Sequence, residues 1–468
     1  MRNASNEWKS DRLENVRAQG DAIADLYLVA AEHQIYDYFL NGFTGTLPLT
    51  PTESGGLTWD EVVSIPSFSV DYGAAKEANA FTVVWSDDES LYATEYEVAF
   101  YYQGNRIAYL DVENDSRITT VDVFTSNPWD KVEISVLGWS DQSTAITVQG
   151  FYLGAVVRFN AENSVNLEVT ERVSLNAFAL PQNSLRLTAI TPSDSSPVEK
   201  TGVFEYIRNG ATVKLTYGKN LSGGWQYING GTFYLSSWEE NDGESVFECL
   251  SSFAMMQKTK FSTDGRVRGL DEVVESAFSQ TGISGSVSGI RTISVVTSTL
   301  TDYDCADIIL LAANASRGTY IMDDDGNAVF RSTYNISHDA VYTVGTESTI
   351  PPVRTTAAPT AKNITVNGDF YTDSGTGDQD VNIDNKFLEV DDELYGKYVA
   401  SEACAWIRNN MAYNLAKSCS YIGDCLLQPL DHISLTEANG RASTVWVTET
   451  QTVFDGAFSF FFSGVVIN

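Results

Sequence analysis

The chain has 468 residues, with 62 acidic against 29 basic side chains and a formal net charge of −33 at pH 7. This balance argues against nucleic-acid binding through phosphate neutralisation, because that mode needs clustered Lys and Arg. The length is too great for one hydrophobic core and predicts about three or four domains. A hydrophobic content of 43% argues against global disorder.

The cysteines and the N-terminal segment indicate the cellular compartment in which the protein folds. The five cysteines are odd in number and form no CxxC pair, and Cys249 and Cys404 fall on apolar faces, so we expect core thiols in a protein that folds in a reducing cytoplasm. Residues 1–20 lack an apolar signal-peptide region, and no run of about 18 apolar residues occurs in the chain. We therefore expect neither a signal peptide nor a membrane-spanning segment.

The first predicted unit, residues 1–45, is a helical arm. Asp11 and Glu14 form a capping pair, apolar residues recur at helical spacing up to residue 41, and Asn41 with Gly42 supplies the stop. More than one face of this helix is apolar. We expect it either to pack within the chain or to dock on another subunit.

The second predicted unit, residues 46–160, is a β-sandwich, because short strand patterns alternate with turn residues. Trp85 and Trp139 are the candidate glycan-binding residues, since an indole ring can stack on a sugar; the alternative is that both rings belong to the core. Residues 87–89 are acidic and could hold calcium, but a polar turn is the simpler interpretation. The predicted strands are 80–85, 96–101, 107–110, 132–136 and a segment within 146–153.

The third predicted unit, residues 161–255, is a small antiparallel barrel or sandwich. Six short patterns follow one another with almost no helical signal, and Gly separates the later ones. The predicted strands are 165–169, 184–188, 213–217, 225–228, 232–235 and 246–250.

The fourth predicted unit, residues 256–347, combines helices with a hairpin. An amphipathic helix over 270–278 is closed by Gly282, a second helix covers 304–316, and a hairpin follows with its turn at 323–327. The acidic turn does not fit a calcium-binding loop, because the ligand positions that such a loop requires are occupied by Ile321 and Ser332.

The fifth predicted unit, residues 348–468, begins with a Thr/Pro/Ala linker over 348–362. A strand near 363–366 and a long helix from about 392 to 416 follow, and then strands at 425–427, 444–447 and 458–466.

Several of these segments together resemble the hub proteins that close the tail tube of tailed bacteriophages. The order of LPQNSL at 180–185, a loop at 191–197, GATVKL at 210–215, GTFYL at 231–235 and Trp238-Glu239 resembles their first barrel. The helix followed by a hairpin around Asp325 and Gly326 is similar to the same family, and PLDHISL at 429–435 resembles its last barrel. KVEISVLGW at 131–139 is similar to the discoidin-type, galactose-binding-like sandwich that precedes the hub barrel in some phage tail proteins.

The resemblance implies a mainly β, multidomain fold with α+β portions, in which a β-sandwich precedes two small hub-type barrels with interspersed helices. It implies a structural virion protein, assembled in the host cytoplasm, at the tail tip or baseplate. The expected partners are two further copies in a homotrimer, tail-tube or distal tail proteins, the tape-measure protein, and tail fibres or receptor-binding proteins. Genome DNA is expected to pass through without specific binding, since an acidic channel repels it.

Nothing in the sequence indicates a catalytic, cofactor or metal site. The three histidines, His33, His338 and His432, are far apart, and the chain has no HExxH, GxSxG or phosphate-loop motif. We therefore expect no catalytic residue, no cofactor and no metal site. Two alternatives stay open, namely a peripheral baseplate protein that binds host glycan and a tail-associated peptidoglycan hydrolase, because a catalytic carboxylate pair is a relation in space.

Overall fold

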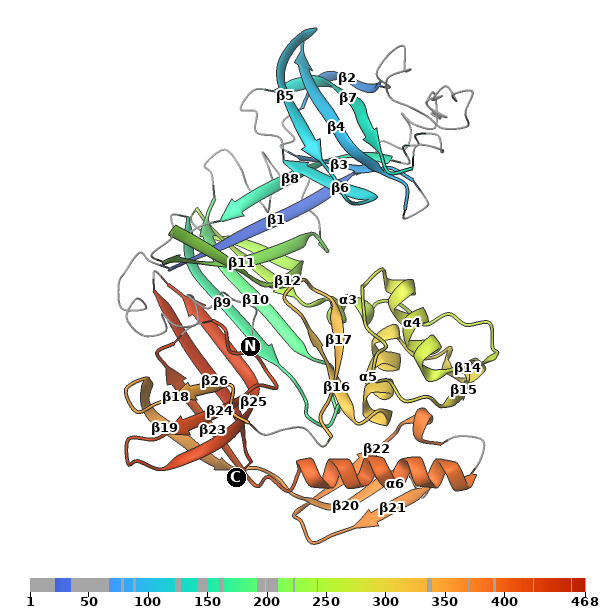
Figure 1. Ribbon diagram of the computed structural model, residues 1–468, viewed down its shortest axis with the longest axis vertical. Coiled ribbons are helices and arrows are strands. Elements are labelled where there is room, and N and C mark those ends of the chain that lie inside the picture. Colours follow the sequence, from blue (N-terminus) through green and yellow to red (C-terminus); the bar gives the residue numbers. More distant parts are fainter. Residues whose placement is uncertain are drawn as a thin grey trace.

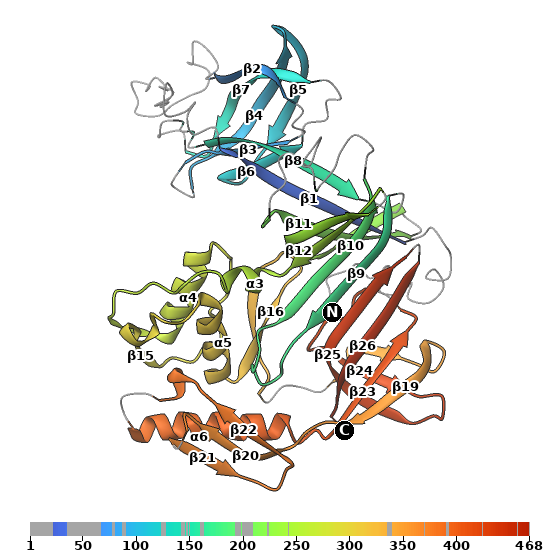
Figure 2. The same ribbon diagram turned by 180° about the vertical axis from the view of Figure 1, so that it is seen from behind.

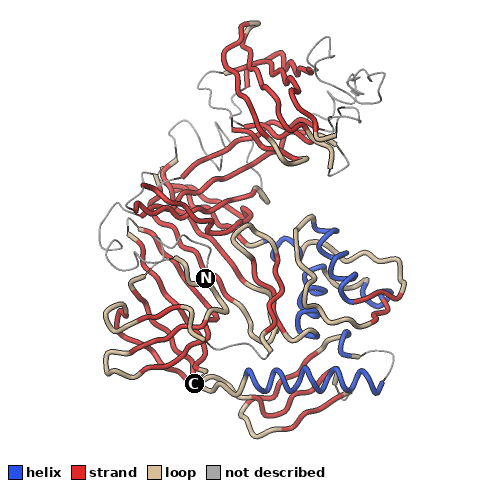
Figure 3. Tube along the Cα trace, in the orientation of Figure 1, coloured by secondary structure: helices blue, strands red, loops and turns tan. Residues whose placement is uncertain are grey.

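The computed structural model gives a mainly β protein with few helices (Figure 3). It describes residues 22–34, 67–76, 80–86, 90–122, 128–141, 146, 148, 150–159, 163–191, 198, 209–221, 224–241, 243–334, 339–368, 370–389, 393–423, 425–455 and 457–467. The acidic residues 87–89 and His338 lie outside the described residues, so the structure does not test the interpretation of either.

One large, mostly antiparallel sheet of 15 strands runs through the molecule (Figures 1 and 2). Its main path is β19-β23-β26-β25-β9-β10-β13-β12-β11-β1-β8-β3-β6, and β24 and β18 attach to it beside β25. The strands of this sheet are β1 (Ala22–Gln34), β3 (Ala80–Val84), β6 (Ile118–Asp122), β8 (Gly150–Phe159), β9 (Ser164–Arg172), β10 (Gln182–Ile190), β11 (Thr212–Leu221), β12 (Gly224–Asn241), β13 (Glu244–Leu250), β18 (Tyr342–Val344), β19 (Thr349–Ala357), β23 (Leu415–Tyr421), β24 (His432–Thr436), β25 (Ala442–Phe454) and β26 (Phe458–Val466).

The strands β9 to β13 form the centre of the sheet and confirm the period-two patterns. Leu185 and Leu187 of β10 are buried, whereas Arg186 between them is exposed, as the alternation of a half-buried strand requires. The two strands predicted at 225–228 and 232–235 are one strand, β12, whose register to β11 shifts between Leu215 and Thr216. Gly231 lies at this irregularity with φ of +121°, a conformation that side chains disfavour.

The predicted N-terminal helix is wrong over the part that the structure describes. Residues 22–34 form β1, which pairs with β11 on one side and with β8 on the other. Its local pattern suits a helix, but two long-range strand partners give this segment an extended conformation instead.

A second set of strands, from residue 342 to residue 466, has the order β18-β24-β25-β26-β23-β19. The two ends of this order, β18 and β19, are consecutive in the chain, so the short turn between them requires the sheet to curl. The set joins the central strands because residues 449–454 of β25 pair with residues 167–172 of β9. The predicted linker over 348–362 is wrong, because β19 occupies most of this range. The predicted strand at 425–427 is also wrong, since these residues are buried but do not form a strand.

The predicted β-sandwich is formed by a second sheet facing β3, β6 and β8. This sheet has the order β2-β7-β4-β5 and consists of β2 (Ser67–Lys76), β7 (Trp129–Trp139), β4 (Ala93–Tyr102) and β5 (Asn105–Glu113). Aromatic rings pack between the two layers. Phe81 of β3 lies 6.1 Å from Phe100 of β4, measured between ring centroids.

The helices gather beside the large sheet, in one α+β unit (Figure 1). The predicted helix stops and starts are confirmed: Gly282 ends α4 in the left-handed conformation, and Asp304 begins α5 with a capping box. The elements are α3 (Ser252–Met256), β14 (Val267–Gly269), α4 (Leu270–Thr281), β15 (Ser294–Val296), a 3₁₀ turn η3 (Thr297–Leu300), α5 (Cys305–Ala315), β16 (Gly318–Met322) and β17 (Ala328–Ser332).

A small sheet and the long helix complete this unit. The sheet has the order β21-β20-β22, from β21 (Tyr371–Ser374), β20 (Ala361–Val366) and β22 (Gln379–Ile383), and it packs against α6 (Glu393–Asn410), with the 3₁₀ turn η4 (Lys386–Leu388) between. The predicted helix over 392–416 is confirmed but ends at Asn410. Two buried clusters result, one in the sandwich and the strand sets and one in the α+β unit, where α6 packs with α5 across the predicted boundary at 347 and 348. The five domain boundaries themselves stay a prediction.

Candidate functional site

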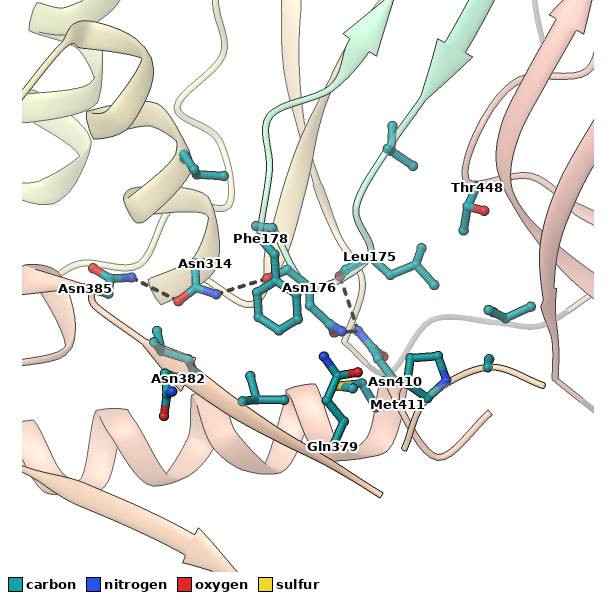
Figure 4. Close-up of a pocket in the computed structure, with 18 of the residues that line it drawn as sticks. Leu175, Asn176, Phe178, Asn314, Gln379, Asn382, Asn385, Asn410, Met411 and Thr448 are labelled. Atoms are coloured by element: carbon teal, nitrogen blue, oxygen red, sulfur yellow. Dashed lines mark hydrogen bonds between the residues drawn. The ribbon is translucent and has the colours of Figure 1, made fainter. Parts of the chain in front are cut away.

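A cleft of about 660 Å³ lies where the large sheet meets the α+β unit (Figure 4). Seven parts of the chain line it: the loop after β9, the last turns of α5, residues 358 and 359 after β19, the strand β22 with residues 384 and 385, the end of α6 with residues 411 and 413, and the strands β25 and β26. These parts are distant in sequence, so only the tertiary fold brings them together. We refer to it as the junction cleft.

Buried amides close one side of the junction cleft. Asn385 donates from Nδ2 to Asn314 Oδ1 at 2.9 Å, and Asn314 donates from Nδ2 to the main-chain oxygen of Asn176 at 3.0 Å (Figure 4). All three side chains are buried. Because a buried amide without partners costs roughly 1–3 kcal/mol, this chain of hydrogen bonds holds the loop after β9 against α5 and the segment after β22.

A second set of hydrogen bonds holds the same loop to α6. Asn410 donates from Nδ2 to Asn176 Oδ1 at 3.0 Å, and Thr333 donates from Oγ1 to the main-chain oxygen of Leu175 at 2.8 Å. Trp406 of α6 donates in turn from Nε1 to Thr333 Oγ1 at 3.0 Å. The loop that connects two strands of the sheet is thereby fixed inside the α+β unit.

The open side of the junction cleft is apolar and acidic. Phe178, which is 47% exposed, lies with Met411 and Tyr413 among the lining residues. Asp380 and Asp384 carry negative charge, and no Lys, Arg or His lines the cleft in the described part of the chain. Such a surface suits a ligand with apolar groups and positive charge rather than an anion.

The hairpin β16–β17 attaches the α+β unit to the sheet at another point. Asn229 of β12 donates from Nδ2 to Asp325 Oδ1 at 2.9 Å, and Gln428 donates from Nε2 to Asp324 Oδ1 at 3.0 Å. The turn between the two strands has Gly326 at φ of +86°, which favours glycine. The acidic turn therefore has a structural role here, with its carboxylates accepting amide hydrogen bonds.

Among the side chains that the structure describes, the cysteines and His432 show no arrangement for catalysis. All five cysteines are buried thiols outside any disulfide, and burial raises the pKa of Cys404 and of Cys419 to about 12. These thiols are therefore protonated at neutral pH and poor nucleophiles. His432 is buried and stacked on Trp446, and within the described residues no group of three or more His, Cys, Asp or Glu could hold a metal ion.

The second strand set contains an ion pair between the buried Lys417 and the partly exposed Glu437. The Lys417 side chain is 1% exposed and donates to Glu437 and to Ser443 Oγ. The hydrogen bond from Lys417 is the main cause that lowers the pKa of Glu437. The Glu437 carboxyl group therefore keeps its proton up to a higher pH in the unfolded chain than in the folded chain. The stabilising contribution of Glu437 is present above the unfolded pKa of about 4.3 and is lost as the pH falls through the folded pKa.

We expect the substitution Glu437→Gln to lower the free energy of unfolding by roughly 1–3 kcal/mol at pH 7, because Lys417 loses its charged acceptor. The difference from the wild type should shrink as the pH falls below about 4. Thermal unfolding at a series of pH values measures this difference, with the exposed Glu239→Gln as the control. An equal difference at pH 7 and at pH 3 would contradict the assigned pair.

The structure places the two candidate glycan-binding residues inside the sandwich. Trp85 is 0% exposed and Trp139 is 4% exposed, and their ring centroids lie 6.0 Å apart in an edge-to-face arrangement. Neither ring face is offered to solvent, so the burial supports the alternative in which both are core residues. They lie together, as one cluster, away from the junction cleft.

The sequence did not indicate the junction cleft or its asparagines. One signal was present: Asn314 interrupts the Ala- and Leu-rich end of a predicted apolar helix. A polar residue at such a position indicates a buried hydrogen-bond partner, but nothing in the local pattern identifies Asn385 or the loop after β9 as that partner.

These features define the class of fold: the chain is a mainly β, multidomain protein in which an α+β unit is attached to a long, mostly antiparallel sheet. Among the helices that the structure describes, none is both long and apolar enough to cross a membrane.

Comparisons with known proteins extend this description. No family model matches the chain, and no curated protein matches it. Among solved structures, the 43 kDa tail protein of prophage MuSo2 from Shewanella oneidensis is similar at 10% identity and a TM-score of 0.45, over 67% of this chain and 94% of that one. A tail protein from Neisseria meningitidis is similar at 10% identity and a TM-score of 0.44, over 66% and 93%.

A component of the type VI secretion system of Escherichia coli is similar at 10% identity and a TM-score of 0.40, over 65% of this chain and 74% of that one. At this level of similarity, these structures assign neither a family nor a function to the chain.

Proposed function

We propose that the chain is a structural protein of a phage tail or a related injection particle, and that it forms the baseplate hub that closes the end of the tail tube. The observation that carries this proposal is the arrangement of two strand sets. Strands β9 to β13 fall within residues 161–255 and strands β19 and β23 to β26 within residues 348–468, the ranges in which the resemblance implies the two hub-type barrels, and β9 pairs with β25 between them. The helix α5 and the hairpin β16–β17 lie between the sets in the chain, in the order that the resemblance implies.

With two strand sets in each chain, a trimer matches the six-fold symmetry of a tail tube. Three copies related by a three-fold axis present six such sets, which form a pseudo-six-fold ring able to match a hexameric tube. The net charge of −33 gives such a ring an acidic surface. DNA passing through an acidic channel is repelled and does not adhere, because adhesion depends on neutralising phosphates.

In this role the protein is mechanical rather than catalytic. It connects the tail-tube or distal tail proteins, the tape-measure protein, and tail fibres or receptor-binding proteins at the tip of the virion. The burial of the cysteines and the structural use of Asp324 and Asp325 agree with that role.

The oligomeric mass of the purified full chain tests the proposal, measured by light scattering and accompanied by electron microscopy. A mass of three chains and a ring with a central hole are the expected results. A protein that stays monomeric would favour a peripheral or sugar-binding role in the baseplate over the hub. Clearing of peptidoglycan in a zymogram would contradict the purely structural role.

A further inference from the structure

The strand β22 is an edge strand that lies along the junction cleft. In the three-stranded sheet β21-β20-β22, it pairs with β20, in parallel, and with no other strand that the structure describes. All five of its residues line the cleft (Figure 4). An unpaired strand edge beside a cavity is a template for a further strand.

The hydrogen bonds on the paired side show which main-chain groups face the open edge. Asn367 donates from its main-chain N–H to Ile383 O at 2.7 Å, and Gln379 donates from its main-chain N–H to Thr360 O at 3.0 Å. Residues 379, 381 and 383 therefore direct their main-chain groups toward β20. Because these groups alternate along a strand, the N–H and C=O of Asp380 and Asn382 face the open edge.

The side chains around this edge favour one chemical class of ligand. Asp380 and Asp384 are exposed and acidic, and the lining contains no basic residue among those described. Phe178 offers an apolar contact from the opposite side of the cleft, facing the strand that carries Gln379 and Asn382 (Figure 4). A polypeptide segment with apolar and basic residues complements both features.

We propose that the junction cleft binds an extended, basic segment of another polypeptide, which adds as a strand to the open edge of β22. The outward-facing main-chain groups of Asp380 and Asn382 pair with the segment, an apolar side chain of the segment contacts Phe178, and a Lys or Arg lies near Asp380 and Asp384. At about 3.3 Å per residue, the length of β22 suits a segment of roughly five residues. The site does not depend on the hub role proposed above.

Two proline variants separate strand addition from general damage. Asn382→Pro removes an outward-facing N–H, at a position where an edge strand tolerates proline. Thr372→Pro is the matched control in β21, the opposite edge of the same sheet. There, Gly375 donates from its N–H to Lys362 O at 2.6 Å, so alternation turns the Thr372 N–H away from β20. Both variants keep the main-chain pairing inside the sheet, and Asn382→Pro also removes the hydrogen bond that Asn382 Oδ1 accepts from Thr365 Oγ1.

The probe is a library of random dodecapeptides, selected on the full-length protein and counter-selected on the Asn382→Pro variant. We expect enriched peptides that alternate apolar residues with Lys or Arg. A synthetic copy of an enriched peptide, labelled with fluorescein, should bind the wild type and the Thr372→Pro variant equally. Its fluorescence anisotropy should show at least ten-fold weaker binding to the Asn382→Pro variant.

The charge of the cleft is tested with the same peptide. The double substitution Asp380→Asn and Asp384→Asn should weaken binding several-fold at low salt and make it less dependent on ionic strength. A selection without enrichment, acidic enriched peptides, or equal binding to both proline variants would overturn the proposal. Self-association of the chain that the Asn382→Pro variant loses would also overturn it, since the occupant would then be a second copy.

Discussion

We expect Trp406→Ala to lower the free energy of unfolding of the α+β unit by roughly 3–5 kcal/mol, the range for removing a large, fully buried aromatic side chain. Trp406 is 0% exposed, and its indole N–H donates to Thr333, which donates in turn to Leu175. The substitution therefore leaves a cavity and also removes the support for the loop after β9. Chemical denaturation followed by far-ultraviolet circular dichroism measures the loss.

Two further variants assign the cause of this loss. Trp406→Phe keeps most of the buried ring but removes the N–H donor, so it should cost less than Trp406→Ala and should still increase amide hydrogen exchange at residues 175–177. Leu394→Ala, on an exposed position of the same helix, should change the stability by less than about 0.5 kcal/mol. A Trp406→Ala protein with wild-type stability would show that α6 does not hold the loop.

Patterns that depend on neighbours in sequence were predictable. The alternation in β10 and the left-handed Gly282 after α4 both follow from local chemistry. The strand β1 was not predictable in this way, because its helical spacing is local while its partner β11 is nearly two hundred residues away. Pairing on both sides outweighs a weak local preference.

The edge strand β19 illustrates a different limit. Its composition predicts a linker, and Pro351 and Pro352 ordinarily break strands. They lie between Ile350 and Arg354, where the register to β23 is irregular, and at the edge of the sheet, the two settings in which a strand accommodates proline. Composition alone does not show whether a segment that contains proline pairs with a neighbouring strand in one of these settings.

The junction cleft was the feature that the sequence predicted least, for a physical reason. Its lining comes from the α+β unit and from strands and loops that precede and follow this unit in the chain, and the bond from Asn410 to Asn176 spans 234 positions in sequence. Buried amides satisfy one another only after both strand sets and both helices are in place. The sandwich, by contrast, was predictable as a fold, while the surroundings of its tryptophans were not.

Trp85→Ala tests whether the tryptophans of the sandwich belong to its core, and we expect a loss of roughly 3–5 kcal/mol in the stability of that unit. The Trp85 ring packs edge-to-face on Tyr96 at 5.0 Å and on Trp139 at 6.0 Å between centroids. Its Nε1 is buried without a hydrogen-bond partner among the described residues. Trp85→Phe should therefore cost much less, because it retains aromatic packing and removes an unsatisfied donor.

The matched control is Ile118→Ala, at an exposed position of β6 in the same sandwich, which should cost less than about 1 kcal/mol. Differential scanning calorimetry of the three variants measures the order of their stabilities, and a sugar array probes glycan binding in parallel. If Trp85→Ala kept wild-type stability and lost binding to a sugar, the ring would act on a ligand and the core assignment would fail. If the stability falls in Trp85→Ala and is mostly retained in Trp85→Phe, aromatic packing between the two sheets, and not the indole N–H, accounts for the contribution of Trp85 to stability.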